Sequence, residues 1–146
     1  AGDGEERSRL AALARTIGVA DRVRFLGVLD QHRLCRVYSA VDALVLASSR
    51  EGWANVLLEA MACGTPVVAS AVWGTPEVVA KPEAGVLMRS LDADGVADGV
   101  RRLFAQVPDR RATRDYAEQF DWDLTTSGQL NLFHDILGRR KRMPRF

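Results

Sequence analysis

Hydrophobic positions along the chain alternate between short continuous runs and longer stretches with helical spacing. The short runs predict four strands, at residues 23–26, 43–47, 66–69 and 85–88. The stretches of helical period predict helices over residues 5–17, 30–40, 55–62, 92–106, 109–120 and 124–137. Strands that alternate with helices are typical of parallel sheets. We therefore predict an α/β fold with a Rossmann-like, doubly wound parallel sheet and an all-helical C-terminal part.

Two features predict how this sheet is built. The run 43–47 is apolar without interruption, which favours a strand covered by helices on both faces. The chain opens with Ala1-Gly2-Asp3-Gly4 and passes directly into a helix, as a strand-to-helix turn does when the strand before it is missing. We therefore expect one N-terminally truncated domain over residues 1–146, with one edge of the sheet incomplete. Its parts are a core over 1–106, C-terminal helices over 107–138 and a basic tail over 139–146.

Composition is that of an ordinary globular domain, with 146 residues, 47% of them hydrophobic and 27% charged. The net charge of +1 gives no electrostatic reason to expect nucleic acid as a partner. Basic residues gather in the tail, which is most simply a solvated end. The alternative is a contact with anionic lipid or a protein partner. An apolar run long enough to span a membrane is not found, so we expect a cytoplasmic protein, with peripheral attachment to the inner face of the membrane as the alternative.

The residues that commonly bind metals are scattered. Cys35 and Cys63 each lie in an apolar helical pattern, and we expect both to be buried as small hydrophobic side chains. His32 and His134 have no potential ligands nearby in the sequence. No metal cofactor is expected from this pattern.

The richest stretch for chemistry is residues 48–59, which follows a predicted buried strand and opens a helix. Open α/β sheets bind ligands at this place, and a helix N-terminus offers unpaired N–H groups and partial positive charge to a phosphate. Gly52 allows the backbone to come close to a ligand. Glu51 lies in the loop and Glu59 one turn inside the helix, so we expect both carboxylates to face one cavity. A carboxylate can accept hydrogen bonds from the hydroxyls of a ribose or hexose. The alternative is that these acids only stabilise the helix dipole.

The segment from Glu51 to Glu59 resembles the E-x7-E motif of the family 4 retaining glycosyltransferases, which have the GT-B fold. The flanking residues 40–46 and 59–69 resemble the strands and helix around that motif. Residues 73–79 resemble the G-x-P-E loop of the family, and Gly2-Asp3-Gly4-Glu5 its first strand–helix turn. The likeness covers residues 1 to about 137. It identifies the chain as the C-terminal donor-binding domain of such an enzyme, without its first strand–helix segment.

The resemblance implies a role for each matching position. Glu59 would bind the ribose of a nucleotide diphosphate sugar, and Glu51 the hydroxyls of its sugar. The sugar and the diphosphate would be held at residues Gly52, Trp53, Ala54, Asn55 and Val56. Residues 24–28 would lie near the base. Helix dipole and basic side chains would replace a metal ion, so no cofactor is implied. The side chain of Trp53 is expected to pack as an apolar lid, with contact to the sugar as the alternative.

The parent enzyme would transfer a hexose to a glycan or lipid-linked acceptor in polysaccharide biosynthesis. The family's diphosphate-binding Arg and Lys and its acceptor domain precede the matched region, so we expect the isolated chain to be inactive. One alternative is a stand-alone nucleotide-sugar-binding or regulatory module, and another is a GT-B-fold sugar-nucleotide epimerase. A glycan phosphorylase would need a lysine for pyridoxal phosphate, and neither Lys81 nor Lys141 has a suitable context. Phe133 is expected in the core. The alternative is that Phe133 and Leu137 are exposed and promote self-association.

Overall fold

A computed structural model describes residues 1–141, except the side chains of Trp122, Leu124 and residues 139–141. Its elements, in chain order, are α1 (Arg7–Thr16), the short 3-10 helix η1 (Ala20–Arg22), α2 (Gln31–Ala40), β1 (Leu44–Leu46), α3 (Asn55–Ala62), β2 (Val67–Ser70), α4 (Thr75–Val78), β3 (Gly85–Met88), α5 (Ala93–Ala105), α6 (Arg110–Ala117) and α7 (Trp122–Lys141). Residues 139–141 of the predicted basic tail are described only as helical backbone. The rest of the tail, residues 142–146, lies outside the described residues.

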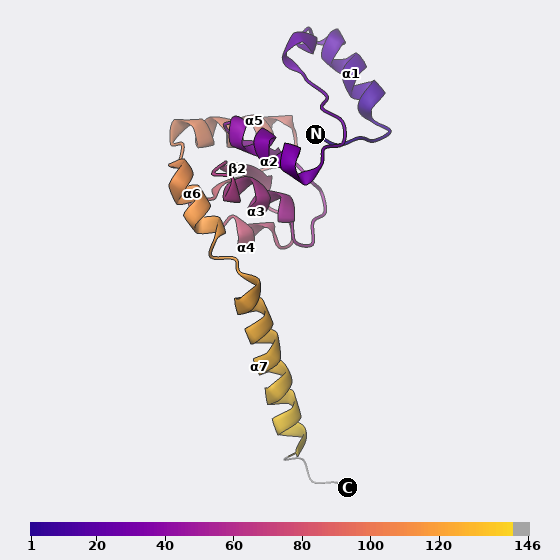
Figure 1. Cartoon of the computed structure of the whole chain (residues 1–146). Coiled ribbons are helices and arrows are strands. Elements are labelled where there is room, and N and C mark those ends of the chain that lie inside the picture. Colours follow the sequence, from indigo (N-terminus) through magenta and orange to yellow (C-terminus); the bar gives the residue numbers. More distant parts are fainter. Residues whose placement is uncertain (142–146) are drawn as a thin grey trace.

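The three strands form a parallel sheet in the order β1-β2-β3, with β2 in the centre. Val68 of β2 is the register partner of both Val45 in β1 and Val86 in β3. Neighbouring side chains of β2 face opposite sides of the sheet, as the pleat requires. Val67 and Ala69 pack into a core with residues of α2, α3 and α6. Val68 packs into a second core with residues of α5. The predicted α/β fold with helices on both faces is therefore confirmed (Figure 1).

Three aspartates begin the main helices. Asp30 accepts a hydrogen bond from the backbone N–H of Arg33 at the start of α2 (2.8 Å). Asp92 caps α5 in the same way, and Asp109 caps α6. A capping side chain satisfies an N–H that has no partner inside the helix, which explains why the helices begin at these residues.

Two glycines allow the layers to come close together. A Cβ atom on Gly85 would lie 2.0 Å from the carbonyl oxygen of Val67, and the φ angle of Gly85 is +135°. A Cβ atom on Gly99 would lie 2.7 Å from Cγ1 of Val68, which brings α5 directly onto β2. Side chains at either position would push β3 or α5 away from the central strand.

Arg110 ties α6 to the ends of two other helices. Its guanidinium group donates to the backbone carbonyls of Ser39 (2.9 Å) and Val41 (3.0 Å), at the end of α2. It also donates to the carbonyl of Cys63 (3.4 Å) and the hydroxyl of Thr65 (3.0 Å), just after α3. The C-terminal carbonyls of a helix lack intrahelical partners, so one arginine satisfies several of them at once.

The predicted strand over residues 23–26 is wrong. These residues are irregular, and nearby there is only an isolated antiparallel bridge between Gly2 and Gly27. Val23, Phe25 and Leu26 are 39–45% exposed. Because backbone groups of a strand need a paired neighbour, an apolar run without one in the described residues does not become a strand. Residues 23–26 and α1 form an arm beside the body of the molecule (Figure 1).

The expectation that the run 43–47 is covered on both faces also needs correction. Within the described residues β1 pairs only with β2, so it is an edge strand of the sheet. Leu44 and Leu46 are half-buried against the α3 side, and Val45 is 42% exposed. Uninterrupted hydrophobicity alone does not distinguish a central strand from an edge strand that is covered on one face.

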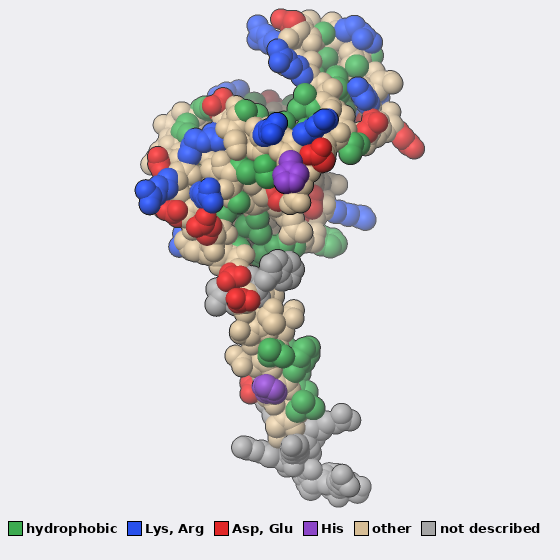
Figure 2. Space-filling model, in the orientation of Figure 1, with side chains coloured by type: hydrophobic (Ala, Val, Ile, Leu, Met, Phe, Trp, Pro, Cys, Tyr) green, Lys and Arg blue, Asp and Glu red, His purple; other side chains and the backbone are tan. Residues whose placement is uncertain are grey.

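The last helix, α7, projects away from the body (Figure 1). Phe133 is 56% and Leu137 55% exposed, so the expected core position of Phe133 is wrong and the alternative, an exposed pair, is correct. Hydrophobic side chains are visible along this helix in Figure 2. Among the described residues, no helix combines the length and the hydrophobicity needed to cross a membrane.

We predict that Gly85→Ala destabilises the fold by about 2–5 kcal/mol, because the added methyl group meets backbone atoms at a positive φ. Gly128→Ala is the matched control. Gly128 lies inside α7 with open space around it, so alanine should leave stability unchanged or raise it by about 1 kcal/mol or less. Urea unfolding of both variants measures the difference. Equal stabilities would contradict the close approach of β2 and β3.

Candidate functional site

Two loops meet at the carboxyl ends of β1 and β2. The hydroxyl of Ser70 donates a hydrogen bond to the carbonyl of Ser48 (2.6 Å), which joins the ends of the two strands. Further along, a Cβ atom on Gly74 would lie 2.5 Å from the carbonyl oxygen of Gly52. The loop after β1 and the loop after β2 therefore form one continuous edge. In open parallel sheets this is the edge at which ligands bind.

At this edge α3 begins with Asn55, as predicted. Its N-cap residue is Ala54, with φ −78° and ψ 81°, and no side chain caps the helix. Ala54 is buried, whereas Gly52 and Asn55 on either side are exposed. No acidic or hydroxyl side chain caps the first turn of α3, and the N–H groups of Asn55 and Leu57 donate to the carbonyls of Trp53 and Ala54 (3.0 Å each). Uncapped N–H groups and the positive end of the helix dipole can attract a phosphate group.

Among the described residues, the small cavity that Glu59 lines does not include Glu51. Glu59 lies one turn inside α3 on the same face as Ala62 and Cys63, because residues three and four apart are neighbours on a helix. This face lines a cavity of about 180 Å³ against α2. Glu51 is half-buried in the loop and lines neither this cavity nor the larger pocket beside Trp53.

Glu59 has a partner that sequence reasoning missed. The hydroxyl of Tyr38 on α2 lies 3.5 Å from Oε2 of Glu59 and donates a hydrogen bond to it. Tyr38 is only 5% exposed. Burial, together with the negative charge of Glu59 and the hydrogen bond to it, raises the pKa of Tyr38 to about 12. The sequence predicted Tyr38 only as part of an apolar helix face, since no local signal links residues 21 positions apart.

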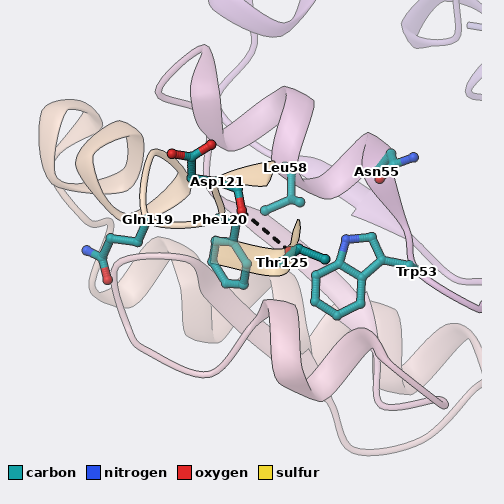
Figure 3. A pocket seen from close by; sticks show the side chains of 7 residues that line it. All are labelled: Trp53, Asn55, Leu58, Gln119, Phe120, Asp121 and Thr125. Carbon is teal, nitrogen blue, oxygen red and sulfur yellow. Dashed lines mark hydrogen bonds between the residues drawn. The ribbon is translucent and has the colours of Figure 1, made fainter. Parts of the chain in front are cut away.

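The larger pocket has a volume of about 600 Å³ and lies between the start of α3 and the junction of α6 with α7. Figure 3 shows Trp53 and Asn55 on one side of it and residues of the C-terminal segment on the other. Its lining consists of Trp53, Asn55, Leu58, Gln119, Phe120, Asp121 and Thr125. The rings of Trp53 and Phe120 have centroids 6.2 Å apart. Trp53 therefore packs partly against the C-terminal segment and remains 46% exposed.

The remaining candidates do not line the pocket beside Trp53. Residues 24–26 line a hollow of about 450 Å³ with residues from the first ten of the chain. The prediction that Cys35 is buried is wrong, because it is exposed, whereas Cys63 is half-buried and both thiols are free. Burial and the neighbouring Cys35 thiol raise the pKa of Cys63. The part of the chain that the structure describes holds no group of three or more metal-binding side chains.

Comparison with known proteins identifies the family. The family described as glycosyl transferases group 1 matches residues 1–120, which include both strand-end loops and α3. The chain belongs to this family. Its α/β architecture, with a parallel sheet and helices on both faces, agrees with the GT-B fold of related glycosyltransferases.

The curated relatives and the solved structures that resemble this chain are much longer proteins. The D-inositol 3-phosphate glycosyltransferase of Stackebrandtia nassauensis is 38% identical over 150 aligned positions, which cover 99% of this chain and 34% of the relative. The chain therefore spans about a third of that relative's length. Sucrose-phosphate synthase from Thermosynechococcus elongatus is 33% identical, with a TM-score of 0.77 over 93% of this chain and 35% of the other.

HepE from Anabaena, solved in complex with UDP and glucose, has the same fold as this group 1 glycosyltransferase domain. Its TM-score is 0.73 at 24% identity, over 92% of this chain and 39% of HepE. At this level of identity the likeness concerns the fold alone.

The Tyr38–Glu59 pair predicts a specific loss of stability in alkali. The pKa of Tyr38 is about 12 in the folded chain and near the ordinary 10.0 in the unfolded one, so the unfolded chain loses its proton first. The stabilisation is complete below pH 10 and is lost as the pH rises towards 12. We expect the wild type to lose about 1 kcal/mol more than Tyr38→Phe between about pH 9 and about pH 11. Urea unfolding at the two pH values tests this, and parallel losses would contradict the raised pKa of Tyr38.

Proposed function

We propose that the chain is the C-terminal donor-binding domain of a family 4 retaining glycosyltransferase, and that its ligand is a nucleotide diphosphate sugar. The observation that carries this proposal is the uncapped N-terminus of α3 at the carboxyl ends of β1 and β2. The glycine before it, Gly52, is exposed and has no neighbouring atom within 4 Å of where a Cβ would be. A diphosphate can therefore approach the backbone there without steric hindrance.

The diphosphate and the sugar bind at the turn into α3. Backbone N–H groups between Gly52 and Val56 donate to phosphate oxygens, except that of Asn55, which donates to the carbonyl of Trp53 (3.0 Å), and the helix dipole favours the negative charge of the phosphates. Glu51, half-buried beside them, accepts hydrogen bonds from hydroxyls of the donor sugar. Ala54 takes part only through its backbone, since its side chain is buried. A metal ion is not needed in this arrangement, because fixed N–H dipoles stabilise the charge of the leaving diphosphate.

The ribose binds at Glu59. Its carboxylate can accept hydrogen bonds from the two neighbouring hydroxyls of a ribose ring. Tyr38 donates to Oε2 of Glu59 and thereby limits the rotation of the carboxylate. Tyr38 is thus a positioning residue that prepares Glu59 for the ribose. The free energy for ordering this side chain is supplied by folding and does not reduce nucleotide affinity.

For the whole enzyme we propose transfer of a hexose with retention of configuration at the anomeric carbon. A glycan or lipid-linked acceptor was expected from the sequence. The name of the Stackebrandtia relative, a D-inositol 3-phosphate glycosyltransferase, adds a small phosphorylated polyol as a further acceptor class. HepE was solved with UDP and glucose, so uridine nucleotides are the first donors to test.

We predict that the chain binds one nucleoside diphosphate series, and that Glu59→Ala weakens this binding by about 1–3 kcal/mol, because the ribose hydroxyls lose their acceptor. Calorimetric titration with UDP, GDP and ADP and their glucose conjugates measures the affinities. Circular dichroism and urea unfolding establish that the variant is folded.

Glu83→Ala is the matched control, since Glu83 is an exposed carboxylate that lines a different pocket, next to α5 and α6. Its affinity for the nucleotide should equal that of the wild type. If a folded Glu59→Ala variant binds the nucleotide as tightly as the wild type does, the assignment of Glu59 to the ribose is wrong.

A further inference from the structure

Trp73 adopts a backbone conformation that is unusual for its residue type. Its φ angle is +46°, the only positive φ of a non-glycine residue in the described part of the chain. It follows Val72 in a turn closed by a hydrogen bond from the N–H of Thr75 to the carbonyl of Val72 (3.0 Å). Gly74, with φ −75° and ψ −8°, completes the pattern of a type II′ turn. The first central position of such a turn favours glycine, and a bulky L-residue there is strained.

Packing within the chain does not explain this strain. The side chain of Trp73 is 71% exposed, so folding gains little from its burial. Strained residues persist where the surrounding structure holds them, and they cluster at sites that bind ligands. A large aromatic side chain that is both strained and exposed therefore indicates contact with a bound molecule.

The position of Trp73 indicates what that occupant is. The next residue, Gly74, lies against the motif loop, since its Cβ would be 2.5 Å from the Gly52 carbonyl oxygen and 3.5 Å from Cε3 of Trp53. Trp53 is itself 46% exposed, and Glu51 lies in the same loop. Adjacent loops thus present two indole rings and a carboxylate. A pyranose ring has an apolar face that suits an indole and hydroxyls that suit a carboxylate.

We infer that Trp73 is a sugar-contact residue, whose indole packs against the apolar face of a pyranose ring at the carboxyl edge of β1 and β2. The inference rests on the proposed function, which places a nucleotide sugar at this edge. The pyranose is either the sugar of the donor or a sugar of the acceptor. Tryptophan offers a large, rigid contact area with only two side-chain torsions to order, which compensates for the strained backbone.

Three substitutions separate the ring from the strain. Trp73→Phe keeps an aromatic ring, and Trp73→Ala removes the ring while keeping the positive φ. Trp73→Gly removes the ring and relieves the strain, so its Tm should rise by about 2–6 °C. Sugar binding should depend on the aromatic side chain at position 73. We expect Trp73→Phe to keep it and both Trp73→Ala and Trp73→Gly to lose it, whatever the stability of each variant.

Two binding experiments identify the source of the sugar. Calorimetry compares UDP with UDP-glucose, and the ADP and GDP pairs in the same way. Saturation-transfer NMR detects methyl glucoside as a free sugar. If the pyranose belongs to the donor, Trp73→Ala and Trp73→Gly lower the affinity for the nucleotide sugar about 5- to 10-fold and leave the affinity for the nucleotide unchanged. If the acceptor supplies it, both nucleotide affinities stay unchanged and the glucoside signal is lost.

The outcomes also separate this inference from the proposed function. If none of the nucleotides binds but the glucoside signal depends on an aromatic ring at position 73, the donor proposal fails and the sugar contact stands. If nucleotide-sugar affinity and the glucoside signal are the same in the wild type, Trp73→Ala and Trp73→Gly, the sugar contact is wrong, whether or not nucleotides bind.

Discussion

The described fold depends on the burial of one strand, β2, between two neighbouring strands and two helical layers. All four of its residues are buried, and Val67, Val68 and Ala69 have no exposed surface. Burying a valine side chain contributes about 1.5–3 kcal/mol, and the backbone of β2 is paired along both sides as well. Gly85 and Gly99 permit this close packing, because any side chain there would collide with Val67 or Val68. The strand is therefore the fixed reference to which the other elements are attached.

The position of the candidate site follows from that constraint. Because β1 and β2 are parallel, their carboxyl ends lie at one edge, and the loops that continue from them must meet there. The Ser70–Ser48 hydrogen bond and the approach of Gly74 to Gly52 hold the two loops together. The rigid sheet thus carries the more variable loops, an arrangement that places a helix N-terminus, a carboxylate and two tryptophans within one region.

Hydrogen bonds made by Arg110 and Tyr38 also help to position Glu59. Arg110 satisfies carbonyls at the ends of α2 and α3, so it fixes the relative position of the two helices that carry Tyr38 and Glu59. Tyr38, buried and with a raised pKa, remains a hydrogen-bond donor to Glu59 over the whole physiological range. The strained backbone at Trp73, in contrast, lowers the stability of the fold, and it lies at an exposed position. Stability is thus concentrated in the core, and the departures from ideal geometry lie at the edge.

The sequence alone determined the features that depend on local pattern. Helical periodicity predicted α2 and α5, and the pattern after the strand over 43–47 placed the start of α3 at Asn55. These signals are local because amphipathic spacing acts within a few residues. The strand predicted at residues 23–26 failed for the converse reason: an apolar run becomes a strand only when a neighbour pairs with it.

Tertiary structure alone decided everything that joins distant segments. It paired Tyr38 with Glu59, turned Glu59 towards α2, and brought Phe120, which follows α6, against Trp53. It also exposed Cys35 and set Trp73 in a left-handed conformation. Local preference could predict none of these, because each depends on which helix faces lie opposite one another once the layers have packed on β2.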